Sequence, residues 1–222
     1  MKVMVLGATG LTGNLVLEQL LAKPEVTSVV VPVRRLLTLV DPKLQQQVIN
    51  FDDLATHDQL FEVDVLVCCL GTTIRKAGSR EAFRKVDHDY ALTAARLARD
   101  SGARALLLMS AVGASASSGV FYNRVKGELE DGVRALKFPY LSIYQPSLLL
   151  GERQERRTAE SLGMAVMPLV NRLLIGPFRK YRAIAASRVA AAMANEVAML
   201  AEEASADPVV KVWEYPDLEN LK

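Results

Sequence analysis

The sequence predicts an α/β protein with a doubly wound parallel sheet and helices on both of its faces. Short apolar runs alternate with longer segments whose apolar residues recur every three or four positions, and this alternation is typical of βαβ units. The first apolar run leads into three glycines, Gly7, Gly10 and Gly13, directly before such a periodic segment. Half of the 222 residues are hydrophobic, which is enough for one sizeable core.

The predicted elements follow one another along the chain as single βαβ steps. A helix starts after the glycines and ends before Pro24, a second helix ends at Gly102, and Ser187 is expected to cap an alanine-rich helix that runs to Ala201. Right-handed crossovers arrange the strands so that a cofactor lies across their carboxyl ends. Strands are expected at 3–6, 29–33, 48–51, 63–70, 105–109, 140–144 and 209–215. The helix that Gly102 stops covers about 80–100, and further helices are expected at about 120–136 and 162–175.

The whole chain, residues 1–222, is predicted to be one domain. Its composition changes after Gly151, and residues from about 151 to 222 are too few for an independent domain. We therefore expect this last part to form a small cap on the substrate side of the cofactor site.

The glycine-rich stretch predicts an anion site at the start of the first helix. The unpaired N–H groups of a helix start and the helix dipole together suit a pyrophosphate. The spacing is G-x-x-G-x-x-G instead of the commoner G-x-G-x-x-G, and a plain tight turn is the alternative interpretation. Gly7 would allow the turn, Gly10 the approach of the ligand, and Gly13 close packing of helix and strand. The expected ligand contacts are Gly7, Thr9, Gly10, Leu11, Thr12 and Gly13.

Residues after the next strands point to the kind of nucleotide. An acid after the second strand would favour NAD, whereas this strand is followed by Arg34 and Arg35. Guanidinium groups suit a 2′-phosphate, so the sequence favours NADP, with two solvated surface arginines as the alternative. Asp53 is placed to reach the adenine, although an exposed loop acid would look the same. Gly71 is expected opposite the glycine-rich stretch.

Tyr122 and Lys126 are the candidate catalytic pair. They stand four residues apart at the start of a predicted helix, so the phenol and the ammonium lie on one face. The ammonium is expected to lower the pKa of Tyr122 towards neutral pH. Such a tyrosine can donate a proton to a carbonyl oxygen, and the lysine can also hold the hydroxyls of the nicotinamide ribose. Ser110, after the fifth strand, is the candidate for hydrogen bonding to the carbonyl oxygen.

In combination these motifs resemble the atypical, NAD(P)H-binding short-chain dehydrogenases/reductases, and within them the oxidoreductases similar to the HIV Tat-interacting protein. The resemblance implies a Rossmann-type fold, NADPH binding, a Tyr122/Lys126 pair and contacts to the nicotinamide from Pro146. The motifs that carry it are 7–13 (GATGLTG), 70–73 (LGTT), 76–78 (KAG), 86–90 (VDHDY), 122–128 (YNRVKGE), and 148–150 (LLL) followed by 153–155 (RQE).

Two positions depart from the pattern of that superfamily. The catalytic hydroxyl is often found in a Ser-Ser pair, and this chain has Ser110 followed by Ala111. If the second position is the catalytic one, the hydroxyl would come from another serine or be absent, and Ser110 would be a structural hydroxyl. Asp87 stands where many relatives have asparagine and is assigned no catalytic role. The other serines that could supply the hydroxyl are Ser115, Ser117 and Ser118.

Composition sets the remaining expectations. A net charge of +2 with mixed signs argues against a nucleic-acid partner, and no apolar run reaches the roughly 20 residues of a membrane span. The apolar start is interrupted by glycines and does not read as a signal peptide. Cys68 and Cys69 are adjacent and have no histidine nearby, so we expect free thiols, no metal site and a reducing, cytoplasmic compartment. Monomer and homodimer both stay open.

These inferences lead to two functional hypotheses. The first is an NADPH-dependent reductase that acts on a small carbonyl compound of unidentified structure. The second is a regulatory or redox-sensor protein that binds NADPH without turnover, which the altered serine position favours. An isomerase with tightly held NAD is a third interpretation, and Arg34 disfavours it.

Overall fold

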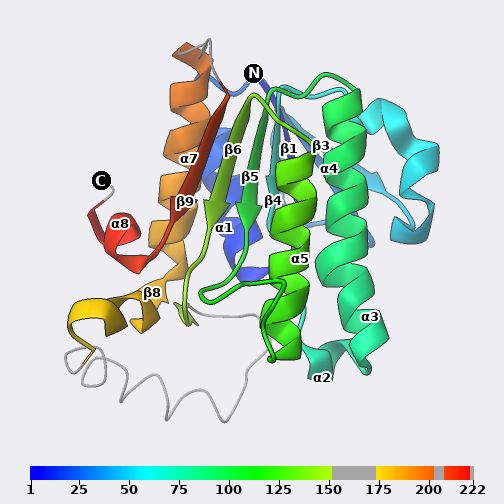
Figure 1. The fold of residues 1–222 in the computed structure, drawn as a ribbon. Helices are drawn as coiled ribbons and strands as arrows, with labels where there is room; N and C mark the ends of the chain where they lie inside the picture. The colour runs from blue at the N-terminus through cyan, green and yellow to red at the C-terminus, as the bar shows by residue number, and fades with distance from the viewer. Residues whose placement is uncertain (152–173, 203–207, 221–222) are drawn as a thin grey trace.

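Seven parallel strands form the central sheet of the computed structural model (Figure 1), which describes residues 1–151, 174–202 and 208–220. The strand order is β3-β2-β1-β4-β5-β6-β9 and every neighbouring pair is parallel. The predicted fold class is therefore confirmed. The strands are β1 (Lys2–Leu6), β2 (Ser28–Val33), β3 (Leu44–Val48), β4 (Val65–Cys68), β5 (Ala105–Met109), β6 (Tyr140–Tyr144) and β9 (Val209–Trp213).

The order of the strands reverses between β1 and β4. From β1 the chain builds outwards to β3, then crosses back to β4 and builds outwards in the other direction to β9. The chain therefore leaves the carboxyl ends of the neighbouring strands β1 and β4 in opposite directions. This is where open α/β sheets bind their ligands.

Two helical layers cover the sheet. Helices α1 (Leu11–Ala22) and α7 (Ala186–Glu202) lie on one face, whereas α4 (Tyr90–Asp100) and α5 (Phe121–Ala135) lie on the other (Figure 1). Side chains that alternate along a strand enter opposite cores: Val3 and Val5 pack on the α1 side, and Met4 and Leu6 on the α4 side. The strand is apolar throughout because both of its faces are buried.

Helix α7 is fixed to the sheet by a buried carboxylate. Glu196 accepts hydrogen bonds from the hydroxyls of Tyr140, Ser142 and Tyr144, at 2.6, 2.7 and 2.6 Å. The helix starts at Ala186, so Ser187 is its second residue and the prediction that Ser187 caps it is wrong.

Strand β3 is shifted from its predicted position. It covers Leu44–Val48 instead of 48–51, with the sequence LQQQV and no fully buried residue. It lies at the edge of the sheet, where side chains meet water. Because an edge strand needs no apolar run, hydrophobicity alone favoured the wrong residues. Residues 51–61 form the 3₁₀ element η1 (Phe51–Phe61), which the sequence did not indicate.

The predicted helix at 80–100 is interrupted in its middle. It consists of α3 (Arg80–Arg84), the π-helical turn η2 (Lys85–Asp89) and α4, and it follows the short helix α2 (Ile74–Ala77). A π turn inserts one extra residue into a helix and is frequent at functional sites.

The C-terminal part contributes to the sheet and to its carboxyl edge. Strands β7 (Leu149–Leu150) and β8 (Ile184–Ala185) pair with each other, and η3 (Gly176–Tyr181) and α8 (Tyr215–Asn220) are short. The helix expected at 162–175 falls almost wholly outside the described residues, and the cap stays a prediction. In the described parts of the chain, no helix combines the length and the apolar character that crossing a membrane requires.

Candidate cofactor and active site

The glycine-rich turn joins β1 to α1 at the point where the strand order reverses. Gly7 has a φ of 80°, and a Cβ there would lie 2.5 Å from the carbonyl oxygen of Cys69 at the end of β4. A Cβ on Gly13 would lie 2.1 Å from the carbonyl oxygen of Gly7. Side chains at these positions would push the turn away from the strand ends, so both glycines are needed for the close approach.

The start of α1 has the features of an anion site. Gly10 is its N-cap, no side chain caps the helix, and the first turn carries no acid. The first N–H groups of a helix have no partner within the helix, and a phosphate placed there would accept them. The residues present therefore fit the pyrophosphate of a dinucleotide. Thr9, Leu11 and Thr12 belong to the same turn.

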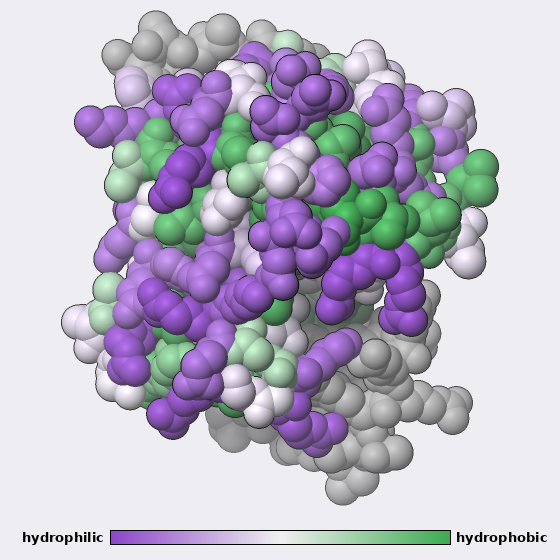
Figure 2. All heavy atoms as spheres, turned by 90° about the vertical axis from the view of Figure 1, so that its right-hand side faces the viewer, coloured by the Kyte–Doolittle hydropathy of each residue, from purple (hydrophilic) through white to green (hydrophobic). Residues whose placement is uncertain are grey.

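The other expected cofactor contacts follow the carboxyl ends of the strands. Arg34 and Arg35 come directly after β2 and are exposed. Gly71 comes after β4, and the buried Pro146 after β6. Because the strands are parallel, these positions lie along one edge of the sheet. Figure 2 shows the adjoining side of the molecule, which is mostly hydrophilic and is hollowed in its lower half.

The two acids after β3 have different surroundings. Asp53 is exposed and accepts a hydrogen bond from the side chain of Asn50 at 2.9 Å. Asp52 pairs with Lys85 at 2.6 Å and accepts a hydrogen bond from the Tyr90 hydroxyl. Asp52 thus ties η1 to η2 and α4, whereas the hydrogen bond of Asp53 stays within its own turn, and its contact with adenine stays a prediction.

Tyr122 and Lys126 lie at the start of α5. Tyr122 is in the first turn and its ring packs on that of Phe83 from α3, with centroids 5.5 Å apart. Lys126 is one turn further and 3% exposed. A Cβ added to Gly71 would lie 4.0 Å from the Lys126 Nζ. Lys126 of the candidate pair is therefore next to the loop after β4, which in turn contacts the glycine-rich turn through Cys69.

Asp87 is a site residue to which the sequence assigned no role. Its Oδ1 lies 2.9 Å from the Lys126 Nζ, and the two side chains are 1% and 4% exposed. Its Oδ2 accepts the backbone N–H of Thr72 at 2.8 Å. The position of an acid where relatives have asparagine was visible in the sequence, but its partner is 39 residues away and only the fold brings them together.

The expected lowering of the tyrosine pKa is not found. Burial raises the pKa of the Tyr122 phenol above its ordinary value; Lys126 opposes this effect and the Asp87 carboxylate adds to it. Burial would lower the pKa of Lys126, but Asp87, Tyr122 and Cys68 together raise it. The sequence motif shows the lysine but not the burial of the phenol, which is the main reason why the lysine alone predicted the wrong direction.

Ser110 is buried and its hydroxyl donates to Glu130 of α5 at 2.5 Å. The Gln145 side chain donates to the same carboxylate at 2.8 and 3.0 Å. A serine has one O–H to donate. In this arrangement that proton is used inside the protein and is not available to a substrate oxygen.

The other serines lie in the loop between β5 and α5. Ser115 and Ser117 are exposed and their hydroxyls are 2.9 Å apart, while the Ser118 hydroxyl accepts the N–H of Val120. The loop crosses α5 at Gly127, where a Cβ would lie 2.1 Å from the Ser115 carbonyl carbon. None of these contacts joins a serine to Tyr122.

Comparison with known proteins shows which family and which individual proteins the chain resembles. A family model described as "NAD dependent epimerase/dehydratase family" matches residues 3–215. Protein HTATIP2 of Rattus norvegicus is 42% identical over 165 residues, which cover 72% of this chain and 68% of that protein. Protein fmp52, mitochondrial, of Emericella nidulans is 35% identical over 173 residues, with 72% of each chain covered. The resemblance inferred from the sequence motifs is confirmed.

Solved structures share the fold at low identity. UDP-glucose 4-epimerase of Thermotoga maritima, solved with UDP-glucose, has a TM-score of 0.69 and 13% identity, covering 96% of this chain and 77% of that one. WbmH of Bordetella bronchiseptica, in complex with NAD+, has a TM-score of 0.68 and 14% identity, covering 96% and 75%. These likenesses confirm the Rossmann-type fold.

The expected cytoplasmic location is contradicted by the relatives. Those from Emericella nidulans, Candida albicans and Meyerozyma guilliermondii are all named as mitochondrial. The expectation rested on Cys68 and Cys69, which are free thiols in the structure. Free thiols indicate a reducing environment, and that property does not distinguish one reducing compartment from another.

Proposed function

Because the chain belongs to the NAD dependent epimerase/dehydratase family, we propose that it is an NADP(H)-dependent oxidoreductase that reduces a small carbonyl compound. One observation carries this proposal. The loop after β4 connects the glycine-rich turn with the start of α5, because Gly7 abuts Cys69 and the Lys126 Nζ lies near Gly71. A dinucleotide seated on the turn would thus extend towards a proton donor.

Each residue has a role that follows from its chemistry. A bound NADPH supplies hydride to the carbonyl carbon. Tyr122 donates its phenolic proton to the carbonyl oxygen, and its raised pKa keeps that proton in place at neutral pH. The buried Lys126 ammonium donates hydrogen bonds to the ribose hydroxyls and favours the phenolate left after proton transfer. Pro146 would contact the nicotinamide, as the resemblance to the family implies.

The cofactor preference is proposed from the end of β2. Arg34 and Arg35 are exposed there, and no acid follows the strand. Charge-assisted hydrogen bonds from a guanidinium favour a 2′-phosphate, whereas the ribose of NAD would meet no acceptor at these positions. Asp53 would bind the adenine.

The test is the Tyr122→Phe variant, which removes one hydroxyl and keeps the ring that packs on Phe83. We expect NADPH-dependent reduction of an accepted carbonyl substrate to fall by about 10²–10⁴-fold, because general acid catalysis contributes about that much. NADPH affinity, measured by fluorescence titration, should stay close to that of the unmodified protein. Unchanged turnover would remove Tyr122 from the role of proton donor.

A second candidate function is supported by Ser110. Its hydroxyl is donated to Glu130, so Ser110 offers no proton to a substrate, as expected of an NADPH-binding sensor without turnover. A broad panel of aldehydes and ketones separates the two. NADPH binding without consumption across the panel, together with a conformational change at the C-terminal part, would favour the sensor.

A further inference from the structure

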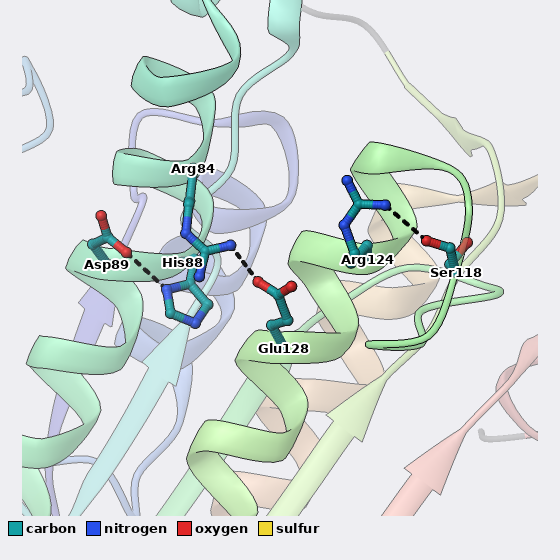
Figure 3. Close-up of polar contacts among 6 residues, drawn as sticks. All are labelled: Arg84, His88, Asp89, Ser118, Arg124 and Glu128. Atoms are coloured by element: carbon teal, nitrogen blue, oxygen red, sulfur yellow. Dashed lines mark hydrogen bonds and ion pairs between the residues drawn. The ribbon is translucent and has the colours of Figure 1, made fainter.

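The two arginines at the end of β2 differ from an arginine at the start of α5 in having no partner within the protein. Figure 3 shows Arg124 of α5 donating to the Ser118 carbonyl oxygen, at 3.0 Å. Arg34 and Arg35 are exposed, and neither makes a hydrogen bond or an ion pair within the described parts of the chain. Their N–H donors are therefore free for an anion, provided that the backbone holds them in place.

The connection between β2 and β3, residues 34–43, contains no helix. The two strands are parallel neighbours, and this segment joins them directly. Parallel neighbours usually need a crossover of a dozen or more residues, most often a helix. Because a crossover without a helix lacks the internal hydrogen bonds that fix a helical backbone, other groups must supply them.

Gln46 in the middle of β3 supplies three such hydrogen bonds. Its Oε1 accepts the Leu37 N–H at 2.7 Å, and its Nε2 donates to the carbonyl oxygens of Leu37 and Leu39 at 3.4 and 3.1 Å. A primary amide can accept and donate at the same time, so it pairs with the Leu37 backbone as a neighbouring strand would. Both leucines also pack on the core on the α1 side. Gln46 thus fastens the β2–β3 connection to the sheet.

The arginines lie between two fixed points of the backbone. Before them, the Val33 carbonyl oxygen accepts the Ile49 N–H at 2.9 Å. After them, Gln46 holds Leu37, so that only residues 34–36 span the distance between the two points. A segment that is held at both ends before the ligand arrives loses less conformational freedom on binding.

We propose that Gln46 is a positioning residue for the 2′-phosphate of NADP(H): it fastens the β2–β3 connection, so that Arg34 and Arg35 are held at the end of β2. The inference rests on the cofactor preference in the proposed function and adds to it a residue that does not touch the ligand. It also gives a reason for a polar side chain beside the core residue Val31, its neighbour in the sheet.

The decisive variant is Gln46→Met, which keeps an unbranched side chain of similar length and removes all three hydrogen bonds. Fluorescence titrations measure the affinities for NADPH and for NADH, which lacks the 2′-phosphate. We expect NADPH affinity to fall about 5- to 20-fold, the cost of ordering about one residue of backbone on binding, and NADH affinity to change less than about twofold. A generally damaged site would lose both nucleotides alike. An unchanged ratio of the two affinities would overturn the proposal.

Gln47→Met is the matched control. Gln47 is the next residue of the same edge strand, is exposed, and has no side-chain partner among the residues that the structure describes. Successive side chains of a strand point to opposite faces, so this variant leaves the β2–β3 connection fastened. Both affinities should stay within about twofold of those of the unmodified protein. An equal loss of NADPH affinity in the two variants would mean that the contacts of Gln46 are not the cause.

A second background shows whether Gln46 acts through the arginines. In a protein with both Arg34→Ala and Arg35→Ala, no guanidinium is left to position. Adding Gln46→Met there should lower NADPH affinity by less than about twofold, because the effects of residues that act as one unit are not additive. A loss as large as in the unmodified background would contradict the proposal.

Amide hydrogen exchange of the unmodified protein without ligand tests the contact independently of any variant. The Leu37 N–H is bonded to Gln46, whereas the N–H of the neighbouring Thr38 has no acceptor in the described parts of the chain. We expect Leu37 to exchange about tenfold or more slowly than Thr38. Equal exchange of the two amides would show that Gln46 does not fasten the connection.

The titrations also separate this inference from the proposed function. Equal affinities of the unmodified protein for NADPH and NADH would refute the NADP preference and, with it, the role of Gln46. A preference for NADPH that survives Gln46→Met would refute the role of Gln46 alone. Neither result depends on turnover, so the test is valid both for a reductase and for a sensor.

Discussion

The Lys126 ammonium pairs with the carboxylate of Asp87 at 2.9 Å, and its charge also acts on the phenol of Tyr122. The spacing of Tyr122 and Lys126 could be read from the sequence, because residues four apart share a helix face. Asp87 could not be paired with Lys126 in that way, since its placement depends on a π turn and on the docking of η2 against α5. Ser110 is similar: its partner Glu130 is 20 residues further along the chain.

At the same scale, Arg34 carries the proposed choice of NADP. Replacing Arg34 by alanine should weaken NADPH binding about 10- to 100-fold, because charge-assisted hydrogen bonds contribute about 1.5–3 kcal/mol. NADH, which lacks the 2′-phosphate, is the matched ligand and its affinity should not change. The measurement is a fluorescence titration of both nucleotides with both proteins. Equal affinities of the unmodified protein for NADPH and NADH would refute the preference.

At the scale of elements, the turn between β1 and α1 depends on close backbone contacts. The sequence predicted this turn because glycines recur directly after a buried strand. The structure adds which contact each glycine serves. Gly13 abuts the turn itself at the Gly7 carbonyl, and Gly7 abuts the end of β4 at Cys69. The expected anion site therefore lies at the point where the order of the strands reverses.

Gly13→Ala should disrupt the glycine-rich turn between β1 and α1. The added Cβ would lie 2.1 Å from the Gly7 carbonyl oxygen, so helix and strand must separate, and we expect a loss of about 3 kcal/mol in the free energy of unfolding. NADPH binding should be lost with it. Gly119→Ala is the control, because a Cβ there meets no atom within 4 Å. Denaturant unfolding of both variants gives the comparison, and equal stabilities would contradict the role of Gly13.

At the scale of the whole molecule, the C-terminal part is built into the main sheet. Helix α7 packs beside α1, and β9 extends the sheet next to β6. The buried Glu196 joins these layers, since the hydroxyls it accepts all come from β6, and the Trp213 indole of β9 donates to Ser142 at 2.8 Å. Residues more than 40 positions apart in sequence therefore form one network.

Glu196→Gln tests how much this network contributes. A glutamine offers one acceptor oxygen where the carboxylate offers two, so the three hydroxyls cannot all be satisfied, and we expect a loss of about 1–3 kcal/mol in the free energy of unfolding. Glu18→Gln, on the exposed side of α1, should change it by less than about 0.5 kcal/mol. Thermal and denaturant unfolding measure both. A stability equal to that of the control would mean that α7 is held by apolar packing alone.

Local and periodic features were determined by the sequence by itself. The parallel sheet, the glycine-rich turn, the helix with Tyr122 and Lys126, and the family follow from patterns within a few residues, where helix and strand geometry fix which side chains share a face. Edge strand β3 could not be found in this way, because it has no fully buried residue and its three glutamines interrupt any apolar pattern.

Only the tertiary structure decided the electrostatics of the site. It placed Asp87 against Lys126, turned the Ser110 hydroxyl towards Glu130, and partly buried Tyr122, whose pKa is raised mainly by the loss of water around it. Each of these depends on charges and dipoles that meet across different elements. Coulomb interactions act through space and are strongest where water is excluded. Spacing along the chain shows neither which charges lie close together in space nor where water is excluded.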